Sequence, residues 1–180
     1  MRKTALALLP VILMLSLSLS TAWAWDPNPN DKQELKVQAA ILDILQKDPG
    51  MADWFKNAAG YAVFPSVGKG GIGVGGAYGK GLVIAGDKVI GSTSLSQVTI
   101  GLQLGGQAYS EFIFFRDETA LADFKRGNFE MGAQASAVAA TTGASADADY
   151  NKGVAIFTNI SGGLMGEASV GGQKFKFEPR

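Results

Sequence analysis

The side chains that most often carry chemistry in enzymes are missing from this chain or stand apart in it. Its 180 residues include neither histidine nor cysteine. This excludes Ser-His-Asp and Cys-His catalysis, zinc sites built from His and Cys, and the usual proton shuttle at neutral pH. The adjacent carboxylates Asp117 and Glu118 would not face each other on a helix, so they suit a helix N-terminus better than an acid–base pair. We therefore expect a protein that is not an enzyme.

Two short motifs are similar to ligand sites but lack the context that those sites require. Gly68 to Gly73 fits the Gly-x-Gly-x-x-Gly pattern, yet the glycine run continues in strand period and opens no helix, so dinucleotide binding is not predicted. Asp147 to Thr158 begins like a calcium loop, but its glycine comes one residue late and its last position is not a glutamate. We therefore expect neither a metal nor a cofactor.

Anion binding is the chemistry that the glycine-rich stretch from Gly60 to Gly81 could perform. Lys69 and Lys80 flank the densest part of this stretch. Exposed glycine N–H groups can form a concave anion site, and a lysine adds a positive charge beside it. A lipid phosphate would suit such a place, and two solvated lysines at strand ends are the simpler alternative. The candidate residues are Lys69, Gly70, Gly71, Gly73, Tyr78 and Lys80.

Two predicted helices precede the glycine-rich stretch and offer a second place for lipid contact. The first spans Lys32 to Lys47 with apolar residues at helical spacing, and the second, from Met51 to Ala59, carries Trp54 and Phe55. A helix with an apolar stripe and interfacial aromatics can lie on a membrane, which makes these two aromatic residues candidates. The acidic residues between the lysines favour packing of the stripe on the sheet instead.

The remainder of the chain has mainly the period-two pattern of β-strands. From Gly71 to Tyr78, three glycines and Ala77 alternate with Ile72, Val74, Gly76 and Tyr78, so one face is nearly bare and allows a close approach or a sharp bend. Phe129 to Ala137 and Lys174 to Phe177 alternate in the same way. A short helix is predicted from Asp117 to Phe124.

Four segments resemble, in order, the SYLF lipid-binding domain family. They are the glycine-rich stretch, Ser96 to Gln107, Phe112 to Phe115 with the helix after it, and Gly153 to Gly166. The resemblance runs from residue 33 to the C-terminus. It implies lipid binding, because eukaryotic members of that family bind phosphoinositides, partly through an N-terminal amphipathic helix, and some bind actin. For an exported protein only a general anionic phospholipid carries over, with Lys69 and Lys80 as the candidates on the matching motif.

Residues 1–24 have the pattern of a cleavable signal peptide. Arg2 and Lys3 form its basic start, an apolar run follows from Ala5 to Leu19, and Ala22-Trp23-Ala24 is a cleavage site of small-residue type. Residues 25–180 are then expected to form a single SYLF-like domain that is periplasmic or secreted, with peripheral binding to a membrane as a further expectation. This part of the chain is slightly acidic, which does not suggest a nucleic-acid partner.

These patterns together predict an α+β protein. Two N-terminal helices and one short internal helix pack on a strongly curved, mostly antiparallel, glycine-rich sheet with a barrel-like form. The expected function is non-enzymatic binding of an anionic phospholipid or an acyl group at a membrane surface. Two alternatives stay open: a small outer-membrane β-barrel, and an envelope protein that is structural or binds a protein partner without a lipid ligand.

Overall fold

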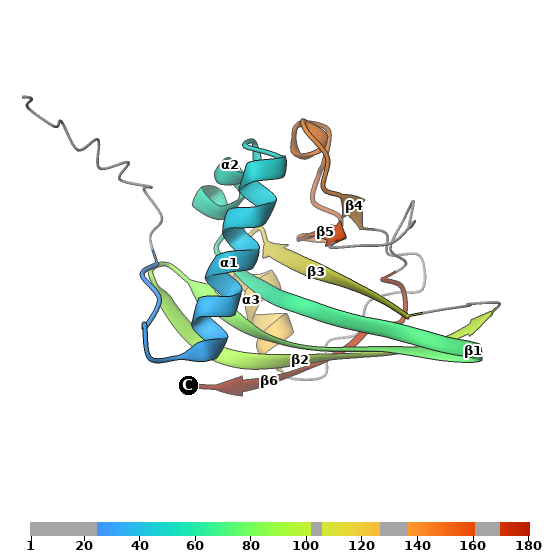
Figure 1. Ribbon diagram of the computed structural model, residues 1–180. Helices are drawn as coiled ribbons and strands as arrows, with labels where there is room; N and C mark the ends of the chain where they lie inside the picture. The colour runs from blue at the N-terminus through green and yellow to red at the C-terminus, as the bar shows by residue number, and fades with distance from the viewer. Residues whose placement is uncertain (1–24, 102–105, 127–136, 161–169) are drawn as a thin grey trace, which may run out of the picture.

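The computed structural model describes residues 25–101, 106–126, 137–160 and 170–180 (Figure 1). The predicted signal peptide, residues 1–24, and nearly all of the predicted strand at 129–137 lie outside these ranges. The helices are α1 (Lys32–Lys47), α2 (Met51–Asn57) and α3 (Glu118–Lys125). The strands are β1 (Gly60–Ala85), β2 (Lys88–Gly101), β3 (Gly106–Phe115), β4 (Val138–Ala139), β5 (Val154–Ile160) and β6 (Lys174–Pro179).

Side-chain caps fix the beginnings of two of these helices. The Asp31 carboxylate accepts hydrogen bonds from the backbone N–H groups of Gln33, at 2.8 Å, and Glu34, at 3.2 Å, so α1 begins at Lys32 as predicted. Asp117 caps α3 in the same way and accepts from the N–H of Ala120 at 3.0 Å. Within the described residues, no helix is both long enough and apolar enough to span a membrane.

The described strands form one sheet in the order β4-β5-β3-β1-β2-β6. Neighbouring strands pair antiparallel except β4 and β5, which are parallel. The first half of β1 pairs with β3 and its second half with β2, so this one strand joins the two parts of the sheet. The edges, β4 and β6, do not pair with each other, and the described sheet is therefore open instead of closed into a barrel.

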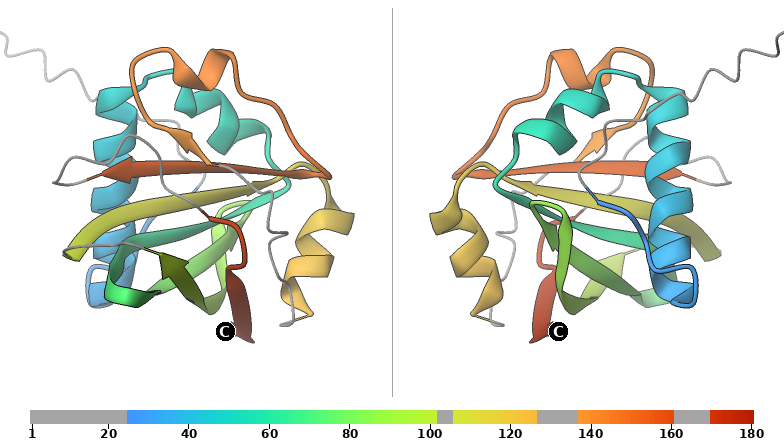
Figure 2. Two further views of the ribbon diagram at one scale, coloured as in Figure 1. Left: turned by 90° about the vertical axis from the view of Figure 1, so that its right-hand side faces the viewer. Right: turned by 90° about the vertical axis from the view of Figure 1, so that its left-hand side faces the viewer.

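Helices cover both faces of the sheet, and a hydrophobic core lies on each (Figure 2). On one face α1 and α2 bury Val37, Ile41 and Phe55 against side chains of β1 and β3. On the other face α3 buries Leu121 and Phe124. We call the face that carries α1 the outer face and the opposite one the inner face. The predicted α+β class, with its helices on a mostly antiparallel sheet, is confirmed.

Glycines let the two halves of β1 approach each other closely. A Cβ atom at Gly81 would lie only 2.5 Å from the carbonyl oxygen of Val63, and one at Gly79 would lie 2.9 Å from the Val67 side chain. Any larger residue at these two positions would force the halves of the strand apart. The glycine alternation of Gly71 to Tyr78 thus continues to Gly79 and Gly81, where the second half of the strand packs against its first half.

Candidate functional site

The pairing of three strands arranges polar side chains in rows on the outer face. Ser94 of β2 lies opposite Lys80 of β1 and opposite Lys176 of β6, so these three residues form one row across the sheet. The next row consists of Tyr78, Ser96 and Lys174. Residues directly opposite each other in an antiparallel ladder share a face of the sheet. The two rows therefore join a β-hairpin and the C-terminal strand into one continuous surface.

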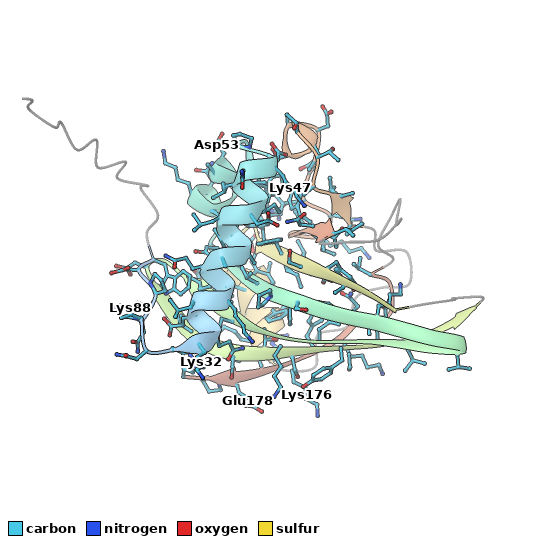
Figure 3. All side chains as sticks on the ribbon, in the orientation of Figure 1. Lys32, Lys47, Asp53, Lys88, Lys176 and Glu178 are labelled. Carbon is cyan, nitrogen blue, oxygen red and sulfur yellow. The ribbon has the colours of Figure 1, made fainter. Side chains whose placement is uncertain are left out.

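A groove of about 320 Å³ lies over these rows, next to the start of α1. Figure 3 shows Lys176 and Glu178 projecting from β6 on the side of the sheet where α1 begins at Lys32. The side chains of α1, β1, β2 and the C-terminus all contribute. The lining residues are Gln33, Tyr78, Lys80, Ser92, Thr93, Ser94, Lys176, Glu178 and Arg180.

Hydrogen bonds between distant segments hold the walls of the groove in place. The Gln33 side-chain amide donates to the carbonyl oxygen of Gly81 at 3.2 Å, which fixes α1 to β1. The Arg180 guanidinium lies 2.9 Å from the Asp31 carboxylate, which ties the C-terminus to the cap of α1. The pKa of Asp31 is lowered by hydrogen bonds from the backbone N–H groups that it caps and, to a smaller degree, by Arg180. The groove is thus a preformed surface feature.

The charges in the groove favour an anionic ligand. Lys80 and Lys176 are exposed, and neither ammonium group forms an ion pair with any residue that the structure describes. The Ser94 hydroxyl lies between them in the row and can donate a hydrogen bond. Glu178 is the carboxylate in the lining, and its negative charge counts against an anionic ligand. Arg180 also lines the groove, but its guanidinium is already paired with Asp31 and Glu34. Two ammonium groups and hydroxyl donors are a set that suits phosphate.

The outer face becomes apolar beyond the groove. Val74, Tyr78 and Val98 are large hydrophobic side chains that are 65%, 55% and 77% exposed. Val98 lies opposite Gly76, in the row after that of Tyr78. Soluble domains seldom leave such a group of side chains exposed without a use for it. This surface extends the basic groove towards the far end of the β1–β2 pair.

The structure places the predicted anion-binding residues on opposite faces of β1. Tyr78 and Lys80 lie at the groove on the outer face. Lys69 follows Val67 on the inner face, where it is 9% exposed and burial lowers the pKa of its ammonium group. Lys69 and Lys80 therefore do not converge on one anion. The two-lysine site expected from the sequence is not assembled, although ligand binding by each residue stays a prediction.

The predicted glycines of the site shape the far end of β1. Gly71 has a φ of 154°, and a Cβ atom there would lie 2.5 Å from the carbonyl oxygen of Val74. Its role is consequently a close backbone approach. Gly73 pairs with Gly101 of β2, and Gly70 pairs with Gly106 of β3, so both backbones belong to ladders. A nest of free N–H groups at these glycines stays a prediction.

The predicted aromatic candidates of α2 pack into the protein. Phe55 is 8% exposed, and its ring lies 5.0 Å from that of Tyr61 and 4.9 Å from that of Phe114. The Trp54 indole packs 4.9 Å from Phe157 and donates its N–H to the carbonyl oxygen of Ser145 at 3.1 Å. These two residues join α2 to the sheet. Neither is placed to enter a membrane, which agrees with the packing alternative.

Sequence reasoning missed the contribution of the C-terminal strand. Lys174 and Lys176 alternate with Phe175 and Phe177, and that pattern alone predicts that the lysines point away from the core. What the pattern does not contain is the partner of β6, which pairs with β2 and brings Lys176 level with Lys80. The sequence therefore indicated that the lysines of β6 point away from the core, but it did not indicate which strand lies beside β6.

A separate polar cluster is buried on the inner face. Glu111 is fully buried, and one of its carboxylate oxygens accepts a hydrogen bond from the Gln173 amide at 2.9 Å. Burial raises the pKa of Glu111 to about 8, and the hydrogen bond from Gln173 only partly offsets this. The hydroxyl of Tyr109 lies next to the same amide at 3.5 Å. Such a carboxyl group is held largely neutral at pH 7.

The fold and the groove define a small α+β domain with a basic surface groove. Residues 96–179 match a family described as Ysc84: Las17-binding protein actin regulator. This match confirms the resemblance to the SYLF family, in the part of the chain that contains the second half of β2 and all later elements. It supports a binding role, with a membrane or a protein as partner, and it leaves Gly60–Gly81 outside the matched residues. No curated protein matches the chain significantly.

Proposed function

We propose that this protein is a non-enzymatic, exported lipid-binding protein that binds anionic phospholipid at a membrane surface through the groove on the outer face. The observation that carries the proposal is the row of Lys80, Ser94 and Lys176, which places a hydroxyl donor between two ammonium groups that have no ion-pair partner among the described residues. The match to a family of binding proteins supports the same class of function.

The groove suits the headgroup of a phospholipid better than its acyl chain. Its lining is dominated by polar and charged side chains, and its volume of about 320 Å³ is near the lower end of the range for small-ligand sites. A phosphate diester offers acceptor oxygens to both lysines and to Ser94. Of the two ligands expected from the sequence, we therefore favour the anionic headgroup over an isolated acyl group.

A binding role without catalysis is consistent with the residues at hand. The whole sequence lacks histidine and cysteine, and the lysines, hydroxyls and one carboxylate of the groove can serve as hydrogen-bonding and charged groups for a ligand. Export through the signal peptide predicted at residues 1–24 would place the protein in the periplasm or outside the cell, where a membrane leaflet supplies phospholipid. Binding would then be peripheral and electrostatic.

A protein partner is the second candidate function. The family description names a protein that binds Las17, and the apolar side chains Val74 and Val98 could pack against a protein surface. The lysines beside them favour an anionic lipid surface, because ammonium groups at a protein interface need individually placed acidic partners. This alternative predicts that the protein binds to vesicles of no lipid composition.

The experiment is flotation of the purified protein with vesicles of phosphatidylcholine alone and of equal parts phosphatidylcholine and phosphatidylglycerol. We expect the protein to float with the anionic vesicles only, and less so as salt is added, because salt screens exposed charges. Extraction and mass spectrometry of the purified protein would identify any lipid carried from the cell. The proposal is wrong if the protein stays behind with both kinds of vesicle.

A further inference from the structure

The outer face changes character along the β1–β2 pair. Near α1 it carries the basic row of Lys80, Ser94 and Lys176, and further along it carries Tyr78, Val98 and Val74. Six residues separate Val74 from Lys80 in one strand, which corresponds to about 20 Å at roughly 3.3 Å per residue. One face of the sheet therefore joins two cationic side chains to a group of exposed apolar ones.

No described helix covers the apolar part of this surface. Helix α1 packs on the outer face at Leu82 and Ile84, and the β1–β2 pair extends well beyond it (Figure 1). Val98 is 77% exposed and Val74 is 65% exposed, both more than any exposed apolar residue of α1. The surface is thus accessible along its full length in the described part of the chain.

We propose that the outer face of the β1–β2 pair is the membrane-docking element and lies flat on an anionic leaflet. Val74, Val98 and Tyr78 would sit at the boundary of headgroups and acyl chains, and Lys80 and Lys176 would reach the phosphates. This inference rests on the proposed function and adds which surface enters the lipid and in what orientation. In this orientation the β1–β2 pair contacts the lipid, and the helices α1 and α2 do not.

Charge complementarity and side-chain type support lipid as the occupant. Cations beside apolar side chains match the order of phosphates and acyl chains in a leaflet, and a tyrosine with an apolar ring and a polar hydroxyl suits the boundary between them. A flat orientation brings the valines and the lysines to the membrane together, whereas insertion of the strand ends alone would leave the lysines about 20 Å away.

The helices are less suited to the same task. Leu35 and Leu42 of α1 are 40% and 52% exposed, which is less than Val74 at 65% and Val98 at 77%. The aromatic residues of α2 are engaged in the core. The most exposed large apolar side chains that the structure describes therefore lie on the strand pair, in the rows beyond Lys80.

The test uses the absence of cysteine from the sequence, which allows a single label at any chosen position. The environment-sensitive dye NBD is attached to Val98→Cys and, as the matched control, to Leu42→Cys on α1. Both labelled proteins are mixed with vesicles of equal parts phosphatidylcholine and phosphatidylglycerol, and flotation records binding in the same samples. Circular dichroism confirms that each variant is folded.

We expect the dye at position 98 to shift its emission to shorter wavelength and to be quenched by spin labels on the acyl chains. The dye at position 42 should do neither. Flotation with a response at position 42 alone, or at neither position, would overturn the docking inference and leave the proposed function intact. Absence of flotation for the unlabelled protein would instead remove both.

A second pair of variants measures the contribution of the apolar side chains. Val74→Ser with Val98→Ser should weaken binding to the anionic vesicles by about tenfold, because burial of these valines in lipid would be lost. The control Leu35→Ser with Leu42→Ser removes two exposed leucines from α1 and should leave binding unchanged. Equal weakening in both pairs would contradict the inference.

Discussion

Lys80 and Lys176 occupy the same row of the sheet, because Ser94 pairs with Lys80 on one side and with Lys176 on the other. The two lysines come from the middle and the end of the chain, and only the strand pairing brings them together. Thr93 reinforces this pairing, since its hydroxyl donates to the carbonyl oxygen of Lys176 at 2.8 Å. The proximity of two lysines in the groove is therefore a consequence of register.

Asp48 is expected to stabilise the protein by hydrogen-bonding the turn between α1 and α2 to the loop before β5. Its buried carboxylate accepts hydrogen bonds from the N–H groups of Gly50 at 3.1 Å, Gly143 at 3.3 Å and Ser145 at 2.8 Å. Asp48→Ala should lower the free energy of unfolding by roughly 1–3 kcal/mol, because it leaves buried donors unpaired. Urea denaturation measures this, and the exposed Asp53→Ala serves as the control.

The same carboxylate should contribute a pH dependence on the acid side. Burial acts to raise the pKa of Asp48, but hydrogen bonds from Ser145, Gly143 and Gly50 outweigh it and leave this pKa below its usual value of 3.8. A lowered folded-state pKa stabilises the protein above pH 3.8, and this stability is lost as the pH falls through the folded-state value. Asp48→Asn should flatten that part of the stability profile, and an unchanged profile would contradict the assignment.

Glu111 should produce the opposite dependence at higher pH. Because burial raises its pKa from 4.5 to about 8, the folded protein holds the proton more tightly than the unfolded chain. The free energy of unfolding should then fall as the pH rises from 4.5 to 8. Glu111→Gln should remove most of this fall, whereas the exposed Glu178→Gln should keep it. Identical profiles for wild type and Glu111→Gln would show that Glu111 titrates normally.

Substitution of Phe55 distinguishes a structural role for α2 from a role in membrane contact. Its ring is packed against Tyr61 and Phe114, so Phe55→Ala should lower the free energy of unfolding by about 3–5 kcal/mol. Binding of the remaining folded protein to anionic vesicles should not change. Vesicle affinity is measured at a temperature where the variant is folded. A large loss of affinity there would place α2 in the membrane contact.

Gly81 tests the close approach within β1. A methyl group at this position would meet the Val63 carbonyl oxygen at 2.5 Å and the Phe64 ring at 2.9 Å, and a backbone atom cannot easily move away. Gly81→Ala should therefore cost about 1–3 kcal/mol of stability. The matched control is Gly68→Ala in the same strand, where no atom lies within 4 Å of the new methyl group. Thermal unfolding compares the two variants, and equal stability would contradict the packing.

Local patterns predicted the elements of this fold well. Asp117 was expected at a helix N-terminus and caps α3, and α1 begins at the predicted Lys32, because the signals that start a helix act within a few residues of its first turn. The glycine alternation also predicted a close approach at β1, since a missing side chain is visible in the sequence itself. Each of these inferences depended on neighbours in the chain.

The candidate site was predicted only in part, because it depends on which strands pair. Tyr78 and Lys80 were identified, but Lys69 was placed beside them although it lies on the inner face of the same strand. Strand alternation puts positions 69 and 80 on opposite faces, so proximity in the sequence was misleading. Lys176 was missed because nothing near it indicates that β6 pairs with β2.

The most direct test of lipid binding at the groove is a vesicle titration of Lys80→Glu with Lys176→Glu, compared with Lys56→Glu with Lys88→Glu. Both pairs change the net charge equally, and the control lysines lie on α2 and at the start of β2, outside the groove. We predict that the first pair loses affinity for vesicles of equal parts phosphatidylcholine and phosphatidylglycerol on the order of a thousandfold, at about 1 kcal/mol for each of the two positive charges removed and the two negative charges introduced. The control pair should retain most of its affinity. An equal loss in both pairs would contradict a localised site, and no loss in either would contradict binding through this groove.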